Sequence, residues 1–176
     1  QIKRQKATTD AAKSRVFSRY ARLIALESKK ANGALSAPNL SVVIARAKAV
    51  NMPKENIERA IAKGISKDSG SLESVIYEAY GPNGTAIIVT ALTDNKNRTT
   101  QEMKHLLLQQ GIELANPGAA SWAFTKTEDV YVPHEPLIEI NSADEEHFSA
   151  ILNALDEHDD VQQVFTNAQG YENSGD

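Results

Sequence analysis

The stretch VIYEAYGPNGTAIIVTAL, residues 75–92, decides the fold class of this chain. Apolar and aromatic residues dominate 75–80, and β-branched residues are frequent in 85–92, so both segments are predicted to be strands. The Gly-Pro-Asn-Gly sequence at 81–84 between them has the composition of a tight turn. The sequence therefore predicts a β-hairpin at the centre of an α+β domain.

Helix and strand signals alternate after this hairpin. The polar segment 93–100 is predicted to begin a helix that ends at Gly111. An acidic helix is expected over 143–157, and further strands are expected at 121–124, 128–133, 137–140 and 161–166. This order predicts an α+β sandwich, with helices on one face of a mostly antiparallel sheet.

The segment before the hairpin has the period of helices. Helices are expected over 9–30, from Pro38 onward, and within NMPKENIERAIAKG at 51–64. In the last of these, Pro53 suits the first helical position and Gly64 suits the residue just past the end. We therefore expect a three-helix domain at 1–67, a linker at 68–74, an α+β domain at 75–168 and a tail at 169–176.

Composition narrows the class of protein. The chain has 176 residues and no cysteine, which excludes disulfides and thiolate metal sites and favours a reducing compartment. No apolar run is long enough for a membrane span, and we expect no signal peptide. We expect a cytoplasmic protein without a cofactor, and further residues before Gln1, because the sequence lacks an initiator methionine.

Charge is distributed very unevenly. Residues 1–67 hold fifteen Lys/Arg and four Asp/Glu, whereas residues 68–176 hold four Lys/Arg and nineteen Asp/Glu. The two parts therefore carry formal charges of +11 and −15, which together give the net charge of −4. Such a basic part indicates a polyanionic partner, although attraction between the two parts is an alternative explanation.

Candidate nucleic-acid-binding residues lie in this basic part. Arg15, Arg19, Arg22 and Lys29 are expected on one flank of the first helix, beside its apolar face. A solvated helix face is the alternative, but Glu27 is the only acidic residue of this helix after Asp10. The complete predicted set in this part comprises Lys3, Arg4, Lys6, Lys13, Arg15, Arg19, Arg22 and Lys29.

Lys96 and Arg98 form a second candidate contact. They are two of the four basic residues after position 67, and both lie in the loop TDNKNRTT at 93–100. The neighbouring Asp94, Asn95 and Asn97 are also ordinary turn and capping residues, so this loop has a structural alternative.

No motif in the chain indicates catalysis. The four histidines, His105, His134, His147 and His158, lack the paired spacing of a metal site. There is no nucleophile motif, and the turn at 81–84 lacks the lysine of a phosphate-binding loop. The carboxylates at 144–146 and 156–160 fit a solvated acidic surface. We therefore expect no enzyme activity.

Several segments together resemble the YebC/PmpR family, which includes the mitochondrial translational activator of cytochrome oxidase subunit one. They are IKRQKATTDAAKSRVFSRYARLI, NMPKENIERAIAKG, YEAYGPNGTAIIVTALTDNKNRT and PGAASWAFTK, and they occur in the family's order. The resemblance implies a helical domain followed by two α+β domains, in a cytoplasmic regulator without enzyme activity.

The chain departs from the family pattern at two places. A Gly-His-Ser-Lys-Trp pattern that usually precedes the basic start is absent. The family also carries a further α+β domain, which is missing here between Lys126 and Val130. Either this domain is deleted from the protein or it exists and is not represented in this sequence, and the junction at 126–130 is then not a native loop.

The resemblance leaves two functions open: a DNA-binding transcriptional regulator, and a translation factor that contacts the ribosome or ribosomal RNA. The exposed acids expected at Glu55 and Glu58 on the third helix would repel phosphates in a DNA groove, which favours structured RNA. The traditional family name favours transcription. A third alternative is a protein-interaction adaptor, in which the basic part binds the acidic part of the chain or an acidic partner protein.

Overall fold

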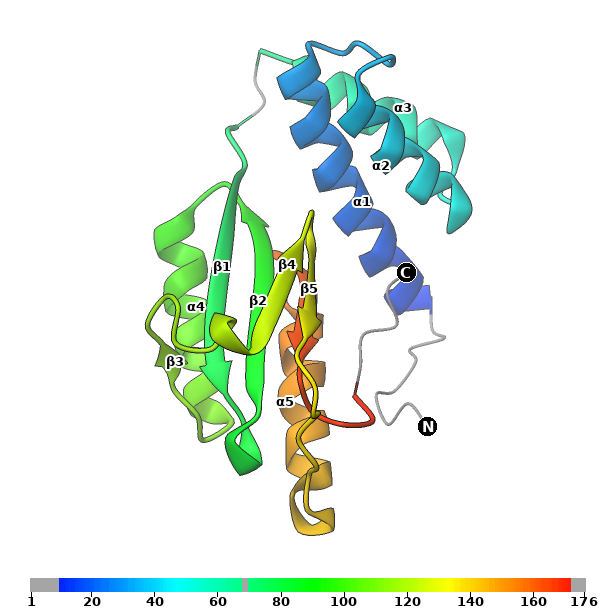
Figure 1. The fold of residues 1–176 in the computed structure, drawn as a ribbon. Helices are drawn as coiled ribbons and strands as arrows, with labels where there is room; N and C mark the ends of the chain where they lie inside the picture. Colours follow the sequence, from blue (N-terminus) through cyan, green and yellow to red (C-terminus); the bar gives the residue numbers. More distant parts are fainter. Residues whose placement is uncertain (1–9, 68–69, 172–176) are drawn as a thin grey trace. The chain divides into compact units, whose positions relative to one another are not determined.

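The segment that decides the fold forms two neighbouring strands, β1 (Glu73–Tyr80) and β2 (Ala86–Thr93). Figure 1 shows them as the predicted hairpin. The turn is closed by a hydrogen bond of 2.8 Å from the amide of Gly81 to the carbonyl of Thr85. Asn83 and Gly84 both have positive φ, which explains the turn composition at this point.

A four-stranded sheet grows from this hairpin in the order β3-β1-β2-β6. β3 (Leu114–Ala115) pairs antiparallel with β1, and β6 (Val161–Thr166) pairs antiparallel with β2. A separate antiparallel ribbon consists of β4 (Phe124–Thr127) and β5 (Val130–Pro133). The predicted α+β class with a mostly antiparallel sheet is confirmed.

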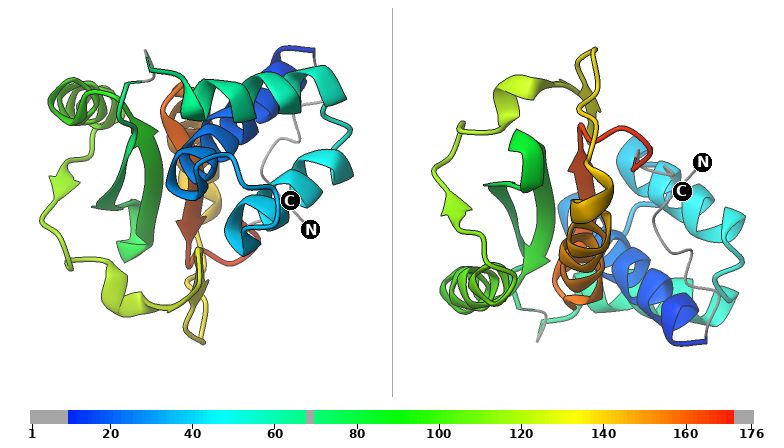
Figure 2. Two further views of the ribbon diagram at one scale, coloured as in Figure 1. Left: turned by 90° about the horizontal axis from the view of Figure 1, so that it is seen from above. Right: turned by 90° about the horizontal axis from the view of Figure 1, so that it is seen from below.

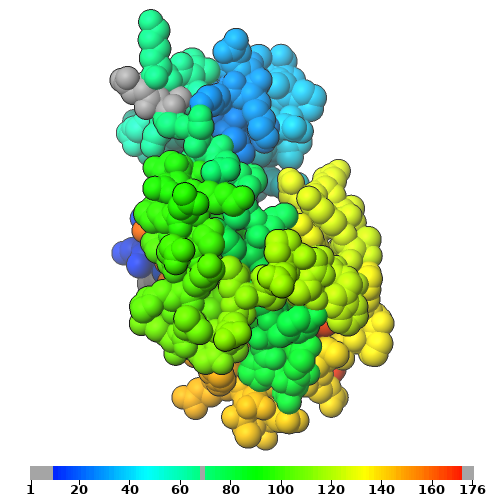
Figure 3. All heavy atoms as spheres, turned by 90° about the vertical axis from the view of Figure 1, so that its left-hand side faces the viewer, coloured from blue at the N-terminus to red at the C-terminus, as the bar shows by residue number. Residues whose placement is uncertain are grey.

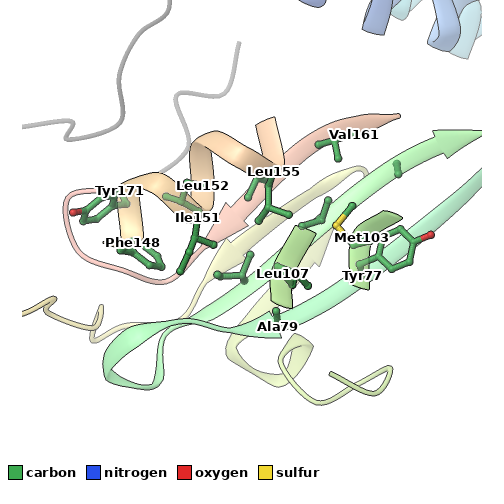
Figure 4. Close-up of a cluster of buried hydrophobic side chains, with 14 of the residues drawn as sticks. Tyr77, Ala79, Met103, Leu107, Phe148, Ile151, Leu152, Leu155, Val161 and Tyr171 are labelled. Carbon is green, nitrogen blue, oxygen red and sulfur yellow. The ribbon is translucent and has the colours of Figure 1, made fainter. Parts of the chain in front are cut away.

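Two helices cover one face of this sheet. α4 (Lys96–Gln109) and α5 (Glu145–Glu157) contribute Met103, Leu107, Ile151 and Leu155 to a core that also contains strand residues such as Val89. Figure 4 shows these helical side chains directed at the strands. Successive residues of β2 point to opposite faces of the sheet, so that Ile87 and Val89 lie in this core whereas Ala86 and Ile88 lie on the second face.

The second face is covered by the segment that follows α4. Figure 2 shows this segment passing around the sheet from α4 to β4 and β5. There, Phe124 and Tyr131 pack with Ile88 and Phe165 in a smaller core. Figure 3 shows the surface of the α+β unit on which α4 and β3 lie, coloured green and yellow-green.

The helical unit consists of α1 (Asp10–Ala31), α2 (Pro38–Ala49) and α3 (Lys54–Ile65). Ile24, Leu40, Ala47 and Ile57 are buried in its centre. The computed structural model describes residues 10–67 and 70–171, which form two compact units on either side of residue 73. Among the described residues, no helix is both long and apolar enough to cross a membrane.

Gly64 corrects one prediction. It was expected just past the end of the third helix, but α3 continues through it to Ile65, and Ser66 is the C-cap residue. A Cβ on Gly64 would lie 2.4 Å from the carbonyl oxygen of Ala25 and 2.8 Å from the Cβ of Ser28. Glycine is therefore required here for the close approach of α1 and α3, not for ending the helix.

Three predicted segments of the α+β unit also differ. Residues 121–123 form a 3-10 turn, and the strand begins only at Phe124. Residues 137–140 do not form the expected strand. Their pairing is limited to an isolated parallel bridge between Ile138 and Ala168, beyond the end of β6. Tyr171 lies in the segment expected to be a tail, but it is fully buried against Phe148, with ring centroids 4.8 Å apart.

The ribbon of β4 and β5 lies where the family's further domain was expected. Thr127 pairs directly with Val130, so that only Glu128 and Asp129 connect the two strands. Glu128 adopts a φ of 54°, as tight turns of this kind require.

Candidate nucleic-acid interface

α1 carries five of the predicted nucleic-acid-binding residues. Lys13 and Lys29 are exposed, whereas Arg15, Arg19 and Arg22 are half-buried. The spacing of 15, 19, 22 and 29 along the helix places these cations on one side of it, as expected. The Nζ atom of Lys29 also lies 3.3 Å from the hydroxyl of Ser71. Lys3, Arg4 and Lys6 lie outside the described residues.

α1 is held firmly against α3. The hydroxyl of Ser28 donates a hydrogen bond of 2.7 Å to the carbonyl of Ile61, and Ser28 itself is fully buried. Gly64 brings the backbone of α3 against Ala25 at the same level of α1. These contacts and the buried Ile24 fix the orientation of α1 within the helical unit, so that its cations are attached to a rigid backbone.

The surroundings of α1 within the helical unit are also basic. Residues 10–67 contain twelve Lys/Arg and four Asp/Glu. Two of the acids form ion pairs within the unit: Glu27 with Lys30 at 3.4 Å, and Glu58 with Lys54 at 3.8 Å. The further exposed cations are Lys30, Arg46, Lys48, Lys54, Arg59, Lys63 and Lys67. The unit therefore has the positive surface that phosphate binding requires.

The second candidate contact has a different geometry. Asn95 caps α4 by accepting a hydrogen bond of 3.1 Å from the amide of Arg98. The Arg98 guanidinium forms ion pairs with Asp94 at 3.3 Å, with Asp160 at 3.1 Å, and with Glu102. Arg98 therefore neutralises carboxylates of its own unit, and this geometry favours a structural role. Lys96 is exposed at the start of α4.

The carboxylates around Arg98 change its pKa. Desolvation lowers the pKa of the guanidinium, but attraction to Asp160 and Glu102, with their hydrogen bonds, outweighs this effect and raises the pKa above its ordinary value. Asp160 is buried and also accepts a hydrogen bond of 2.8 Å from the hydroxyl of Thr99. This network joins the start of α4 to the start of β6.

Glu102, His158 and Asp160 bring three possible metal ligands together, and sequence reasoning missed this cluster. Its geometry does not favour a metal ion. Arg98 already pairs with both carboxylates, and Nδ1 of His158 accepts a hydrogen bond of 3.1 Å from the amide of Asp160. The proton of a neutral His158 then lies on Nε2, which faces Glu102 at 3.7 Å.

Family models match two parts of the chain. Residues 1–67 match the TACO1/YebC protein N-terminal domain, and residues 72–135 match the TACO1/YebC second and third domain. A crystal structure described as a conserved hypothetical protein, Aq1575 from Aquifex aeolicus, has a TM-score of 0.82 and 29% identity to this chain. That likeness covers 96% of this chain and 95% of the other.

Two bacterial relatives are each named "Probable transcriptional regulatory protein". The protein of Thermosipho africanus is 40% identical over 171 residues, which cover 94% of this chain and 66% of the relative. The protein of Fervidobacterium nodosum is 35% identical over 226 residues, which cover 94% of this chain and 90% of the relative.

These alignments also show that this chain is shorter than its relatives. It spans just under two thirds of the Thermosipho africanus protein. The 226 aligned positions with the Fervidobacterium nodosum protein exceed the 176 residues of this chain by 50, so that relative has at least that many residues without a counterpart here.

Proposed function

This chain belongs to the TACO1/YebC family, and from that premise we propose that it is a nucleic-acid-binding regulator of gene expression that acts without catalysis. The names of its relatives support a regulatory role. We assign nucleic-acid binding to the helical unit, and specifically to α1 with Arg15, Arg19 and Arg22.

The observation that carries this proposal is the combination of charge and rigidity in the helical unit. Residues 10–67 contain twelve Lys/Arg and only four Asp/Glu, and two of these acids form ion pairs with lysines. A basic surface releases counterions from a nucleic acid when it binds phosphates, and this release dominates affinity. Because Ser28 and Gly64 fix α1 against α3, the backbone that carries these cations is already ordered before binding.

DNA-binding regulation of transcription agrees with the names of the relatives. It would place the basic unit on duplex phosphates, with sequence read by side chains at the base edges. Arginines on one side of α1 have the donors for both kinds of contact.

A translation factor that binds ribosomal RNA is the second candidate, and one observation favours it. Glu55 and Glu58 are exposed on α3, so this helix would meet phosphates with acidic side chains if it entered a DNA groove. Structured RNA can be bound through its backbone and shape without inserting a helix in this way.

Binding across a salt series tests the proposal. Fluorescence anisotropy would be measured with a labelled DNA duplex and with labelled ribosomal RNA fragments. We expect binding at low salt to at least one of them, with an affinity that falls steeply as the salt concentration rises. A preference for RNA would support the translation factor. Absence of binding to both at low salt would refute the proposal and favour the protein-interaction adaptor.

A further inference from the structure

The only tryptophan of the chain lies on the surface of the α+β unit. Trp122 is 68% exposed, although its neighbours Ala123 and Phe124 are buried in the smaller core. Its indole N–H donates a hydrogen bond of 2.9 Å to the hydroxyl of Tyr80, which is itself 37% exposed. The hydroxyl of Tyr80 in turn donates to the carbonyl of Ala119. We call Tyr80 and Trp122 the aromatic pair.

A buried carboxylate fixes the loop that carries Trp122. Glu78 on β1 is 6% exposed and accepts hydrogen bonds from the backbone amides of Gly118 at 2.6 Å, Ala120 at 2.9 Å and Ser121 at 2.7 Å. Hydrogen bonds to an ionised acceptor are about twice as strong as neutral ones. The loop before Trp122 is therefore held by three such bonds to one side chain, and the indole is held in one orientation.

A rigid and exposed aromatic pair has the properties of an interaction surface. Tryptophan and tyrosine are the residues most enriched among those that dominate binding energy, because they bury a large area with little loss of rotamer freedom. Ile76 adds a third exposed apolar side chain on the same face of β1 as Tyr80. The internal hydrogen bonds of the pair reduce the entropy that binding would cost.

Charge decides which kind of partner fits. Residues 68–176 carry four Lys/Arg and nineteen Asp/Glu, and Arg98 is already paired with three of the carboxylates. Such a unit repels phosphates, so nucleobase stacking on Trp122 is disfavoured. It attracts a basic protein surface instead, because complementary charge raises the association rate and suppresses other partners.

We propose that the aromatic pair is a docking surface for a protein partner whose contacting surface is basic and carries an apolar side chain. This surface is in a different unit from α1, so its test is independent of nucleic-acid binding. The partner's apolar side chain packs against the indole, and its cations are attracted by the net negative charge of residues 68–176.

The test uses short peptides on the whole chain. The probe is a peptide of alternating lysine and leucine, compared with one of lysine and serine and one of glutamate and leucine. Trp122 is the only tryptophan, so its fluorescence reports this site alone. We expect a blue shift with the lysine–leucine peptide only, since only this peptide combines positive charge with apolar side chains.

Variants locate the binding site. Binding of the labelled lysine–leucine peptide should weaken about tenfold in Trp122→Ala and in Tyr80→Ala. Leu108→Ala is the matched control, because Leu108 is 60% exposed in the same acidic unit, and it should bind as the parent does. If circular dichroism shows that Tyr80→Ala is unfolded, Trp122→Ala alone decides the test, because the indole is 68% exposed and its removal leaves the buried Phe124 in place.

Two results would overturn the proposal. One is equal binding of the peptide by the parent chain, Trp122→Ala and Leu108→Ala. This result would show that the peptide is attracted by the net charge of the unit and not by the aromatic pair. The other is a response of Trp122 fluorescence to a single-stranded polyuridine oligonucleotide and not to the peptide, which would make the aromatic pair a nucleobase-stacking surface.

Discussion

The hydroxyl of Ser28 on α1 donates a hydrogen bond of 2.7 Å to the backbone carbonyl of Ile61 on α3. This bond lies beside Gly64, where a Cβ would approach the carbonyl oxygen of Ala25 to 2.4 Å. A glycine and a small hydroxyl residue thus set the spacing of two helices, and the cationic side of α1 depends on that spacing.

Gly64→Ala is expected to destabilise the helical unit by about 1–3 kcal/mol, because the added methyl group forces two backbones apart. Chemical denaturation followed by circular dichroism would measure the loss. Ala62→Ser on the exposed side of α3 is the control, with an expected change within about 0.5 kcal/mol. A Gly64→Ala variant as stable as the parent would show that the helices can separate without cost.

Replacing Arg15, Arg19 and Arg22 together with alanine is expected to weaken nucleic-acid binding and to reduce the slope of log affinity against log salt by about one for each lost phosphate contact. Lys104→Ala is the control, because it removes an exposed cation from α4 in the α+β unit, and its affinity should equal that of the parent chain. Unchanged affinity together with a lower melting temperature would show that the arginines are structural.

Arg98→Met is expected to destabilise the α+β unit by about 1–3 kcal/mol, because it leaves the buried Asp160 without its cation. This is less than the roughly 3–5 kcal/mol expected for a fully buried pair, because 43% of the Arg98 side chain is exposed. The nucleic-acid affinity of Arg98→Met should equal that of the parent chain. Lys96→Ala is measured beside it, because it removes the other cation of the same loop and leaves the ion pairs of Arg98 intact. A large loss of affinity in Arg98→Met, with stability retained, would restore Arg98 as a binding residue.

The pH dependence of the contribution that Arg98 makes to the stability of the α+β unit follows from the direction of its pKa shift. The pKa of Arg98 is raised in the folded chain, so its contribution is fully present below the pKa of the unfolded chain and is lost only as pH rises through the folded value. Because both pKa values lie far above neutrality, the stability difference between the parent and the Arg98→Met variant should not change with Arg98 titration between about pH 6 and 9. Denaturation of both proteins at several pH values would check this.

Glu78→Gln is expected to loosen the loop that carries Trp122, since an uncharged amide accepts fewer and weaker hydrogen bonds than a carboxylate. Amide hydrogen exchange at Gly118, Ala120 and Ser121 should accelerate, and the fluorescence of Trp122 should change. Glu113→Gln, an exposed substitution in the same unit, is the control. Unaltered exchange would show that packing alone holds the loop.

Most of the fold could be predicted from periodicity and turn composition. The helical period placed α1, α2 and α3, and the Gly-Pro-Asn-Gly turn placed β1 and β2. These features depend on residues close to one another in the chain, so they can be predicted from a single sequence. Gly64 could not be interpreted in this way, because a glycine near a helix end has the same local pattern whether it ends the helix or contacts another one.

The features that sequence reasoning missed depend on contacts between distant segments. β3 has only two residues and forms because β1 lies beside it. Tyr171 is buried because α5 places Phe148 next to it. The cluster of Glu102, His158 and Asp160 joins residues more than fifty positions apart, and no local spacing indicates it. The buried partner of Arg98, Asp160, is also distant in sequence. Its other two partners, Asp94 and Glu102, lie four residues away on either side, and this local spacing could have indicated a structural role for Arg98.

The central claim is that the helical unit binds nucleic acid through phosphates. Its most direct test is the affinity of the intact chain for duplex DNA and for ribosomal RNA fragments, measured from low to physiological salt. We predict binding to at least one of them, with a steep decrease in affinity as salt rises. Absence of binding to either at low salt would contradict the claim.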